Sequence, residues 1–236
     1  MKNILGTLIC LSLCTTAIGQ VNFEGPNDIE GQRLRDINAF TSDVRVSKLE
    51  QLDYLSEKFD GSPFLCKEWN EGKVIFEDGQ SIKYQMHYNV YAQEFWIKKD
   101  KSKIKKLKIV KNIDKIELQD KQFQFVIHKL NQETKSSIME LLVDKKHRLY
   151  KQHNCKFLNG DKNVNSYSGP QKSKFSQNQK YFYSNGDEIL PLPTKKKAFF
   201  KCFGDDSTKI AAFCKKNKLK TNKNTDLVKI FEFYNQ

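Results

Sequence analysis

The fold class of this chain is decided by one stretch, Ile82-Lys83-Tyr84-Gln85-Met86-His87-Tyr88-Asn89-Val90. Apolar and polar side chains alternate along it, and in a β-strand this alternation puts the apolar side chains on one face and the polar ones on the other. Asp78-Gly79, just before it, is typical of a two-residue hairpin turn. The stretch therefore predicts a strand of an antiparallel sheet with one buried and one solvated face.

Segments with the same period of two continue from residue 73 to residue 157. The turns between them are too short for the helical crossovers that parallel strands need. The segments cover residues 74–76, 95–97, 107–110, 116–118, 123–127, 138–143 and 149–157. We therefore expect an antiparallel meander of about eight strands, which can curl into a half-barrel.

Beyond this sheet the pattern changes to a second hairpin and then to helices. Asn185-Gly186 lies between the short apolar segments 181–183 and 188–190, which predicts the hairpin. Three short helices should follow, the first capped by Thr194, the second by Asp205 or Asp206, and the third beginning near Thr225. They cannot bury their apolar faces alone, so we expect them to pack on the hairpin or the sheet.

The predicted fold class is α+β. The boundaries that we expect are a signal peptide at 1–19, a lead-in with a short helix at 20–60, the antiparallel β-sheet domain at 61–158, a flexible linker at 159–180, and the hairpin plus helices at 181–236. The linker is inferred from its length and its abundance of Asn, Ser, Gln and Lys.

Residues 1–19 have the three parts of a cleavable secretory signal peptide. Lys2 supplies a positive charge, residues 4–13 form a short apolar run, and Ala17 and Gly19 are the small residues before the expected cleavage site. The run is shorter than the roughly 20 residues that cross a bilayer. The pattern indicates an exported protein of the periplasm, the cell surface or the medium, and not a membrane-spanning one.

The chain carries a formal net charge of +13, almost all of it from lysine. Such a charge attracts anionic partners. Bidentate recognition of phosphate or guanine favours the arginine fork, yet only four arginines are present. We therefore expect an anionic envelope component as the partner, such as a lipid headgroup, a polysaccharide or an acidic protein, and no nucleic acid.

Two groups of residues are candidates for binding. The first is the lysine run between residues 98 and 111, which contains Lys99, Lys101, Lys103, Lys105, Lys106 and Lys108. It is either a docking edge for an anionic partner or a solvated strand pair whose lysines oppose edge-to-edge aggregation. The second group is Tyr84, Tyr88 and Trp96, which either line a concavity for an apolar ligand or belong to the core.

Four cysteines remain after removal of the signal, and they allow three pairings. We favour a disulfide between Cys202 and Cys214, with buried free thiols as the alternative. His147, His153 and Cys155 share one strand parity and are candidate metal ligands. A mixed sheet face with a buried thiol explains them better, because no carboxylate lies at ligand spacing. No metal or cofactor is therefore predicted.

Catalytic signatures are absent, including G-x-S-x-G, H-E-x-x-H, G-x-x-x-x-G-K-[ST] and G-x-G-x-x-G. His87 and His128 are the best candidate bases, but we expect both to be solvated surface residues. Asp205 and Asp206 are explained by helix capping. We therefore assign no catalytic residue.

Several short motifs resemble an uncharacterised family of secreted bacterial proteins. They are Gly61-Ser62-Pro63-Phe64-Leu65, Gly72-Lys73-Val74-Ile75-Phe76, Asp78-Gly79, Tyr88-Asn89-Val90-Tyr91 and the terminal Phe233-Tyr234-Asn235. The resemblance runs from about Gly61 to the C-terminus. It implies export and a layout of strands followed by helices, and it transfers no catalytic residue.

The leading hypothesis is a non-enzymatic binding or structural protein of the cell envelope, because function must be argued from a site and no catalytic site is visible. Two alternatives stay open. One is a hydrolase that acts on an envelope polymer, and the other is a carrier of a lipid or another hydrophobic ligand.

Overall fold

The structure is a computed structural model that describes residues 41–43, 59–98, 104–107, 112–130, 133–160 and 172–236. All of these residues belong to one compact unit, Asn38–Gln236. The predicted signal peptide and most of the predicted lead-in at 20–60, which was expected to contain a short helix, lie outside the described residues.

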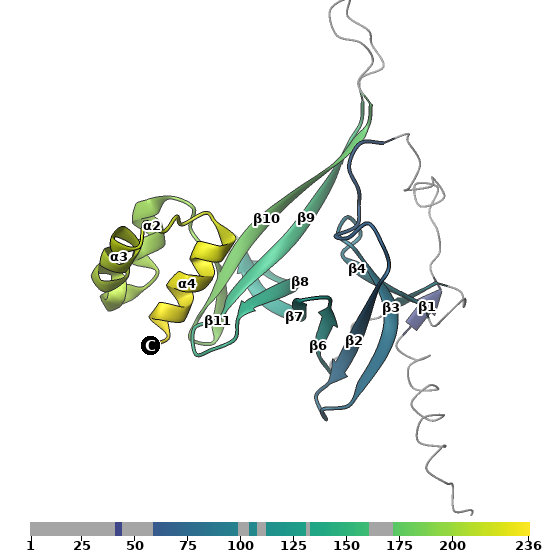
Figure 1. Cartoon of the computed structure of the whole chain (residues 1–236), viewed down its shortest axis with the longest axis horizontal. Helices are drawn as coiled ribbons and strands as arrows, with labels where there is room; N and C mark the ends of the chain where they lie inside the picture. Colours follow the sequence, from purple (N-terminus) through teal and green to yellow (C-terminus); the bar gives the residue numbers. More distant parts are fainter. Residues whose placement is uncertain (1–40, 44–58, 99–103, 108–111, 131–132, 161–171) are drawn as a thin grey trace, which may run out of the picture. The chain divides into compact units, whose positions relative to one another are not determined.

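Eleven strands of the described residues form one antiparallel sheet in the order β1-β5-β4-β3-β2-β6-β7-β8-β9-β10-β11 (Figure 1). Their bounds are β1 Thr41–Asp43, β2 Asn70–Phe76, β3 Ser81–Asn89, β4 Glu94–Lys98, β5 Lys105–Leu107, β6 Ile113–Leu118, β7 Lys121–Leu130, β8 Glu133–Val143, β9 Leu149–Leu158, β10 Lys174–Asn185 and β11 Glu188–Pro191. The antiparallel sheet is confirmed, and no ladder closes it within the described part of the chain. The expected meander is wrong at one step, because β6 pairs with β2 on the far side of the β2–β3 hairpin from β5.

The deciding stretch forms β3, with Tyr84, Met86 and Tyr88 buried on one face as predicted. The opposite face departs from the prediction, because His87 and Asn89 are also buried. The segment before β2 covers this face, where the ring of Phe64 stacks on His87 at 3.9 Å. β3 is therefore packed on both of its faces, and burial lowers the pKa of His87.

Both predicted hairpins are confirmed. Gly79 and Gly186 occupy the turns with φ of 80° and 61°, a left-handed backbone that glycine adopts without steric cost. The first turn joins β2 to β3 and the second joins β10 to β11.

The sheet forks between β8 and β9. These two strands pair only where Glu140–Val143 of β8 meets Leu149–Lys151 of β9. Beyond that point β9 continues with β10 alone, up to the pair Leu158 and Lys174, and Figure 1 shows the two strands extending together past β8. The predicted linker at 159–180 is therefore wrong for residues 174–180. Their polar side chains resemble a loop in composition because this stretch of β10 is largely exposed.

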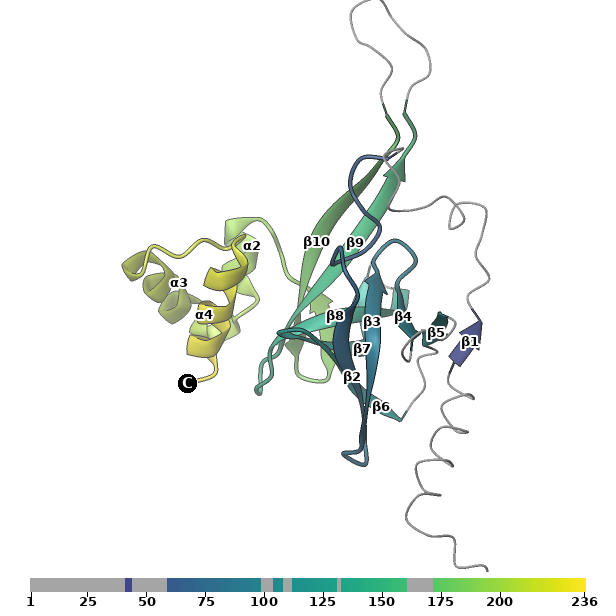
Figure 2. The ribbon, with the colours of Figure 1, turned by 45° about the vertical axis from the view of Figure 1, so that its right-hand side comes forward.

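Three helices of the described residues follow the sheet, as predicted: α2 Lys196–Lys201, α3 Ser207–Lys216 and α4 Asn224–Tyr234 (Figure 2). The expected cap position is wrong for α2 and correct for α3, although the side-chain cap bond of α3 is not formed. The N-cap position of α2 is Lys195, not Thr194, and Asp206 occupies the N-cap position of α3 without a side-chain cap bond. The stability of these short helices must therefore come mainly from packing.

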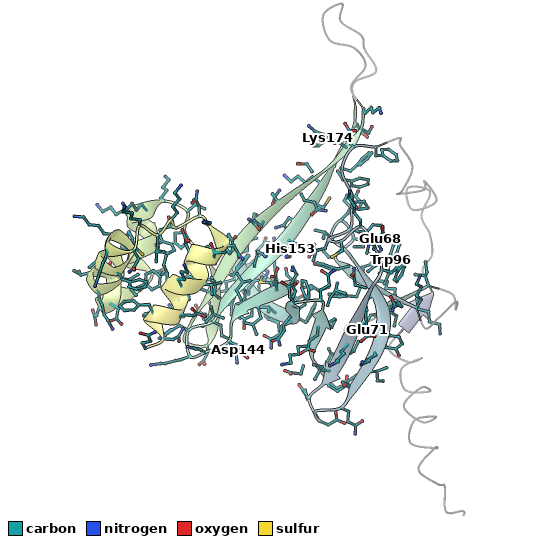
Figure 3. The ribbon with its side chains drawn as sticks, viewed as in Figure 1. Glu68, Glu71, Trp96, Asp144, His153 and Lys174 are labelled. Carbon is teal, nitrogen blue, oxygen red and sulfur yellow. The ribbon has the colours of Figure 1, made fainter. Side chains whose placement is uncertain are left out.

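The helical unit packs on the end of the sheet. Leu149 and Tyr183 of the strands join a buried cluster with the helix residues Phe199, Ile210 and Leu227. Asn235, at the C-terminal end of α4, also bonds the backbone of His147 in the β8–β9 turn: its Oδ1 accepts the His147 N–H and its Nδ2 donates to the His147 carbonyl oxygen. Figure 3 labels Asp144 in the same turn. No helix in the described part of the chain is long and apolar enough to cross a membrane.

Candidate functional site

The predicted lysine edge is described only in part. Lys105 and Lys106 lie in β5, and Lys106 forms an ion pair with Glu94 of β4. The other candidates, Lys99, Lys101, Lys103 and Lys108, lie outside the described residues. The docking edge therefore stays a prediction.

The three aromatic candidates are buried in the sheet's own packing. Tyr84, Tyr88 and Trp96 each keep less than a tenth of their surface exposed. Tyr88 stacks on Phe95 with ring centroids 4.6 Å apart, and its hydroxyl donates to Gln93 Oε1. These side chains contribute to the core and do not line an open concavity.

The metal candidates do not converge. His147 lies in the turn before β9 and stacks on Tyr234, whereas Cys155 Sγ lies 3.9 Å from the carbonyl oxygen of Ser62. The described residues hold no group of three His, Cys, Asp or Glu side chains that could bind a metal ion.

The expected disulfide is not formed, because Cys66, Cys155, Cys202 and Cys214 are all free thiols. The Sγ of Cys202 donates to the carbonyl oxygen of Phe199, 2.8 Å away. Burial raises the pKa of Cys202 to about 12. Cys214 is buried as well, on α3.

His128 is buried rather than solvated, and burial lowers its pKa. Its Nε2 lies 3.0 Å from Ser137 Oγ, which also accepts a hydrogen bond from Gln152 Nε2. Serine and histidine are two members of a catalytic triad, whose third member is a carboxylate that accepts a hydrogen bond from the histidine Nδ1–H. Among the described residues no side chain bonds that atom. We therefore assign this pair to packing.

The sequence analysis did not predict a cluster of three polar side chains with little exposure, formed by Glu140, Lys151 and His153, which we call the trio. Glu140 Oε2 lies 2.7 Å from Lys151 Nζ and 2.6 Å from His153 Nε2, and the three side chains are only 7%, 9% and 12% exposed. Figure 3 shows His153 on β9. Burial alone would raise the pKa of Glu140, but the hydrogen bonds from His153 and Lys151 outweigh it, so that the pKa is lowered. The Glu140 carboxylate is bonded by both Lys151 and His153, so we assign the trio a structural role at the point where β8 and β9 separate.

A pocket of about 650 Å³ lies in the helical unit. Its walls follow from helical periodicity: Lys196 and Phe200 are one turn apart on α2, and Cys214 lies three residues after Ala211 on α3. The loop after α3 closes the remaining side. Because four lysines line it, namely Lys196, Lys215, Lys218 and Lys220, we call it the lysine pocket.

The electrostatics of the lysine pocket are one-sided. All four lysines are exposed, and none forms an ion pair with another described residue. None of the described lining residues is acidic. Residues 194–236 as a whole contain eleven lysines and four acidic residues. The pocket therefore concentrates positive charge, which favours anions.

One wall of the pocket is held in an unfavourable backbone conformation. Lys218 has φ of 55°, in the left-handed region that usually takes glycine or asparagine at the end of a helix. Its N–H donates to the carbonyl oxygen of Lys215, and the N–H of Leu219 donates to that of Cys214. These two bonds reverse the chain and return Leu219 to the helical core. A lysine in this position costs about 1–2 kcal/mol of backbone strain.

Asp226 holds the loop that closes the pocket. Its Oδ2 accepts the N–H of Lys220 at 3.0 Å, and its Oδ1 lies 3.4 Å from Thr225 Oγ1. The bond from the Lys220 N–H is the main cause that lowers the pKa of Asp226. The carboxylate therefore orders the loop through the backbone of Lys220, while the side chain of Lys220 lines the pocket.

In the sequence analysis, the lysines of this region contributed only to the net charge. The signal that could have found them is the lysine at the start of one helix combined with Lys215, Lys218 and Lys220 around the end of the next. Comparisons of the chain with protein-family models, with curated proteins and with solved structures give no significant match. The resemblance to a secreted bacterial family stays a prediction.

Proposed function

We propose that this chain is an exported, non-enzymatic binding protein that holds an anionic ligand in the lysine pocket. The observation that carries the proposal is a concave site with four lysines and no lining acid among the described residues. Four cations that line one pocket repel one another, and a bound anion relieves that repulsion. The predicted signal peptide supports a function in the periplasm or at the cell surface.

The pocket offers binding chemistry and no reaction chemistry. Lysine ammonium groups are donors that suit carboxylate, phosphate or sulfate oxygens. Among the residues that line the pocket, the thiol of Cys214 is the candidate nucleophile. Burial raises the pKa of this thiol, which favours the unreactive protonated form. A role in holding a ligand therefore fits the pocket better than a covalent step.

The direct test is titration calorimetry with pyrophosphate, which carries several negative charges and no apolar part. We expect saturable binding that weakens as the salt concentration rises, because the lysines are exposed and screened. The variant Lys196→Gln with Lys215→Gln should bind about tenfold or more weakly, since each charged hydrogen bond contributes about 1.5–3 kcal/mol.

Adjacent lysines provide a matched control. Lys197→Gln with Lys216→Gln removes the same charge from the same two helices, at exposed positions that do not line the pocket. This control should change the affinity for pyrophosphate by less than about threefold. Equal losses in the two double variants would show diffuse charge attraction instead of a site, and a lack of binding to the wild type would refute the function.

A further inference from the structure

We infer that the ligand of the lysine pocket is an anionic amphiphile, with one charged head and a single alkyl chain. This inference rests on the proposed function and adds the ligand class to it. It commits to a monomeric amphiphile and not to the surface of a bilayer.

The floor of the pocket differs in chemistry from its rim. The floor consists of the apolar lining residues Phe200, Ala211, Cys214 and Leu219, which are buried or half-buried, whereas the four lysines of the rim are exposed. Cys214 belongs to the buried core of the helical unit, and Phe200 and Leu219 pack against that core while remaining partly exposed. An inorganic anion would leave this apolar surface in water, whereas an alkyl chain would cover it.

The rim is built from side chains that match such a ligand. Lysine stems are apolar and their ammonium groups stay in water, so the stems of Lys196 and Lys215 can flank a chain while their ends hold the head. These two residues come from different helices, and each lies one turn from an apolar lining residue of its own helix: Lys196 from Phe200 on α2, and Lys215 from Ala211 on α3. The charge and the apolar surface therefore meet along one line of the pocket.

The strained loop supports the same ligand class. The left-handed backbone at Lys218 aims the next residue, Leu219, back at the core, where it becomes part of the floor. A single backbone reversal thus places a lysine in the rim and a leucine in the floor. Strain of this kind is found at ligand sites, where surrounding contacts hold it.

The experiment measures the affinity of the full chain, without its signal peptide, for phosphate, butyl phosphate and octyl phosphate. All are used below the concentration at which octyl phosphate forms micelles. Each methylene that enters the pocket should tighten binding about fourfold, until the floor is covered. Octyl phosphate should therefore bind far more tightly than phosphate, and Lys196→Gln with Lys215→Gln should weaken both.

Neighbouring alanines provide matched variants for the floor. Ala211→Phe fills the pocket, whereas Ala212→Phe places the same ring on an exposed position of α3 outside the lining. Ala211→Phe should abolish the dependence on chain length and keep the affinity for pyrophosphate within about threefold, which also shows that the variant is folded. Ala212→Phe should leave both affinities unchanged.

The outcomes separate the two proposals. Lysine-dependent affinity that does not change with chain length would overturn the amphiphile and leave the anion-binding function intact. If neither pyrophosphate nor octyl phosphate binds, the function itself fails. If the protein binds vesicles of an anionic phospholipid through the four lysines but shows no saturable binding of octyl phosphate monomers, the ligand is a membrane surface and the inference is wrong.

Discussion

Glu140 and Lys151 face each other on the last rung that joins β8 to β9, with Glu140 Oε2 and Lys151 Nζ 2.7 Å apart. Past this rung, β9 turns away from β8. The carbonyl oxygen of His153, in the separated part of β9, accepts a hydrogen bond from Gln93 Nε2 at 2.9 Å. The ion pair therefore lies where the sheet splits, and the side chain of Gln93, in the turn between β3 and β4, bonds a carbonyl group of β9 past the split.

Replacing one member of this pair should be costly. Glu140→Gln leaves the buried Lys151 without its counter-charge, so we expect a loss of about 3 kcal/mol in the free energy of unfolding, measured by urea denaturation. The matched control is Glu71→Gln, which breaks the exposed pair with Lys83 and should cost less than about 1 kcal/mol. A loss at Glu140 as small as that of the control would mean that the trio does not stabilise the fork.

Glu140 should also make the free energy of unfolding decrease at acidic pH. The folded-state pKa of Glu140 is lowered below the ordinary value of 4.5. A lowered carboxyl pKa contributes stability above the unfolded-state value, and this contribution is lost as the pH falls through the folded-state value. The midpoint of urea unfolding should therefore decrease below about pH 4.5 more steeply in the wild type than in Glu140→Gln. Parallel pH profiles for the two proteins would contradict the lowered pKa.

We expect the thiol of Cys202 to react slowly with alkylating reagents in the folded protein. Cys202 has a pKa of about 12 because it is buried, so at pH 8 only about one molecule in ten thousand carries its thiolate. Iodoacetamide should label Cys202 far more slowly in the folded protein than in urea, as followed by peptide mass spectrometry. Without reductant, all four thiols should react in urea. A Cys202–Cys214 crosslinked peptide would instead restore the disulfide that the sequence favours.

The sequence predicted the strands where its pattern reports a physical constraint directly. Alternation along residues 82–90 located β3, and glycine at the two hairpin turns located the ends of four strands. It failed where a distant segment changes the environment of a residue. His87 was predicted to be solvated, but Phe64 and Trp69, from the segment before β2, cover its ring.

The candidate site was missed for a related reason. Glu140 is the one acid in the apolar half of β8, residues 138–143, and its partners Lys151 and His153 lie beyond a turn whose register the sequence does not reveal. The lysine pocket depends on how α2 packs beside α3, and on a left-handed residue that is a lysine where glycine would be expected. Composition predicted an anionic partner, but it pointed to the lysine run at residues 98–111.

Lys218 affects both the stability of the fold, through its left-handed backbone, and the charge of the lysine pocket. Glycine adopts φ near 55° without strain, although it adds flexibility to the unfolded chain. Lys218→Gly should therefore raise the free energy of unfolding by about 0.5–1 kcal/mol. The same change removes one of the four lysines of the pocket, so it should weaken pyrophosphate binding several-fold. Lys216→Gly is the control, since this helical position gains nothing from glycine and should lose about 1 kcal/mol without affecting binding. A more stable Lys218→Gly variant with unchanged affinity would show that Lys218 is strained for a reason other than the ligand.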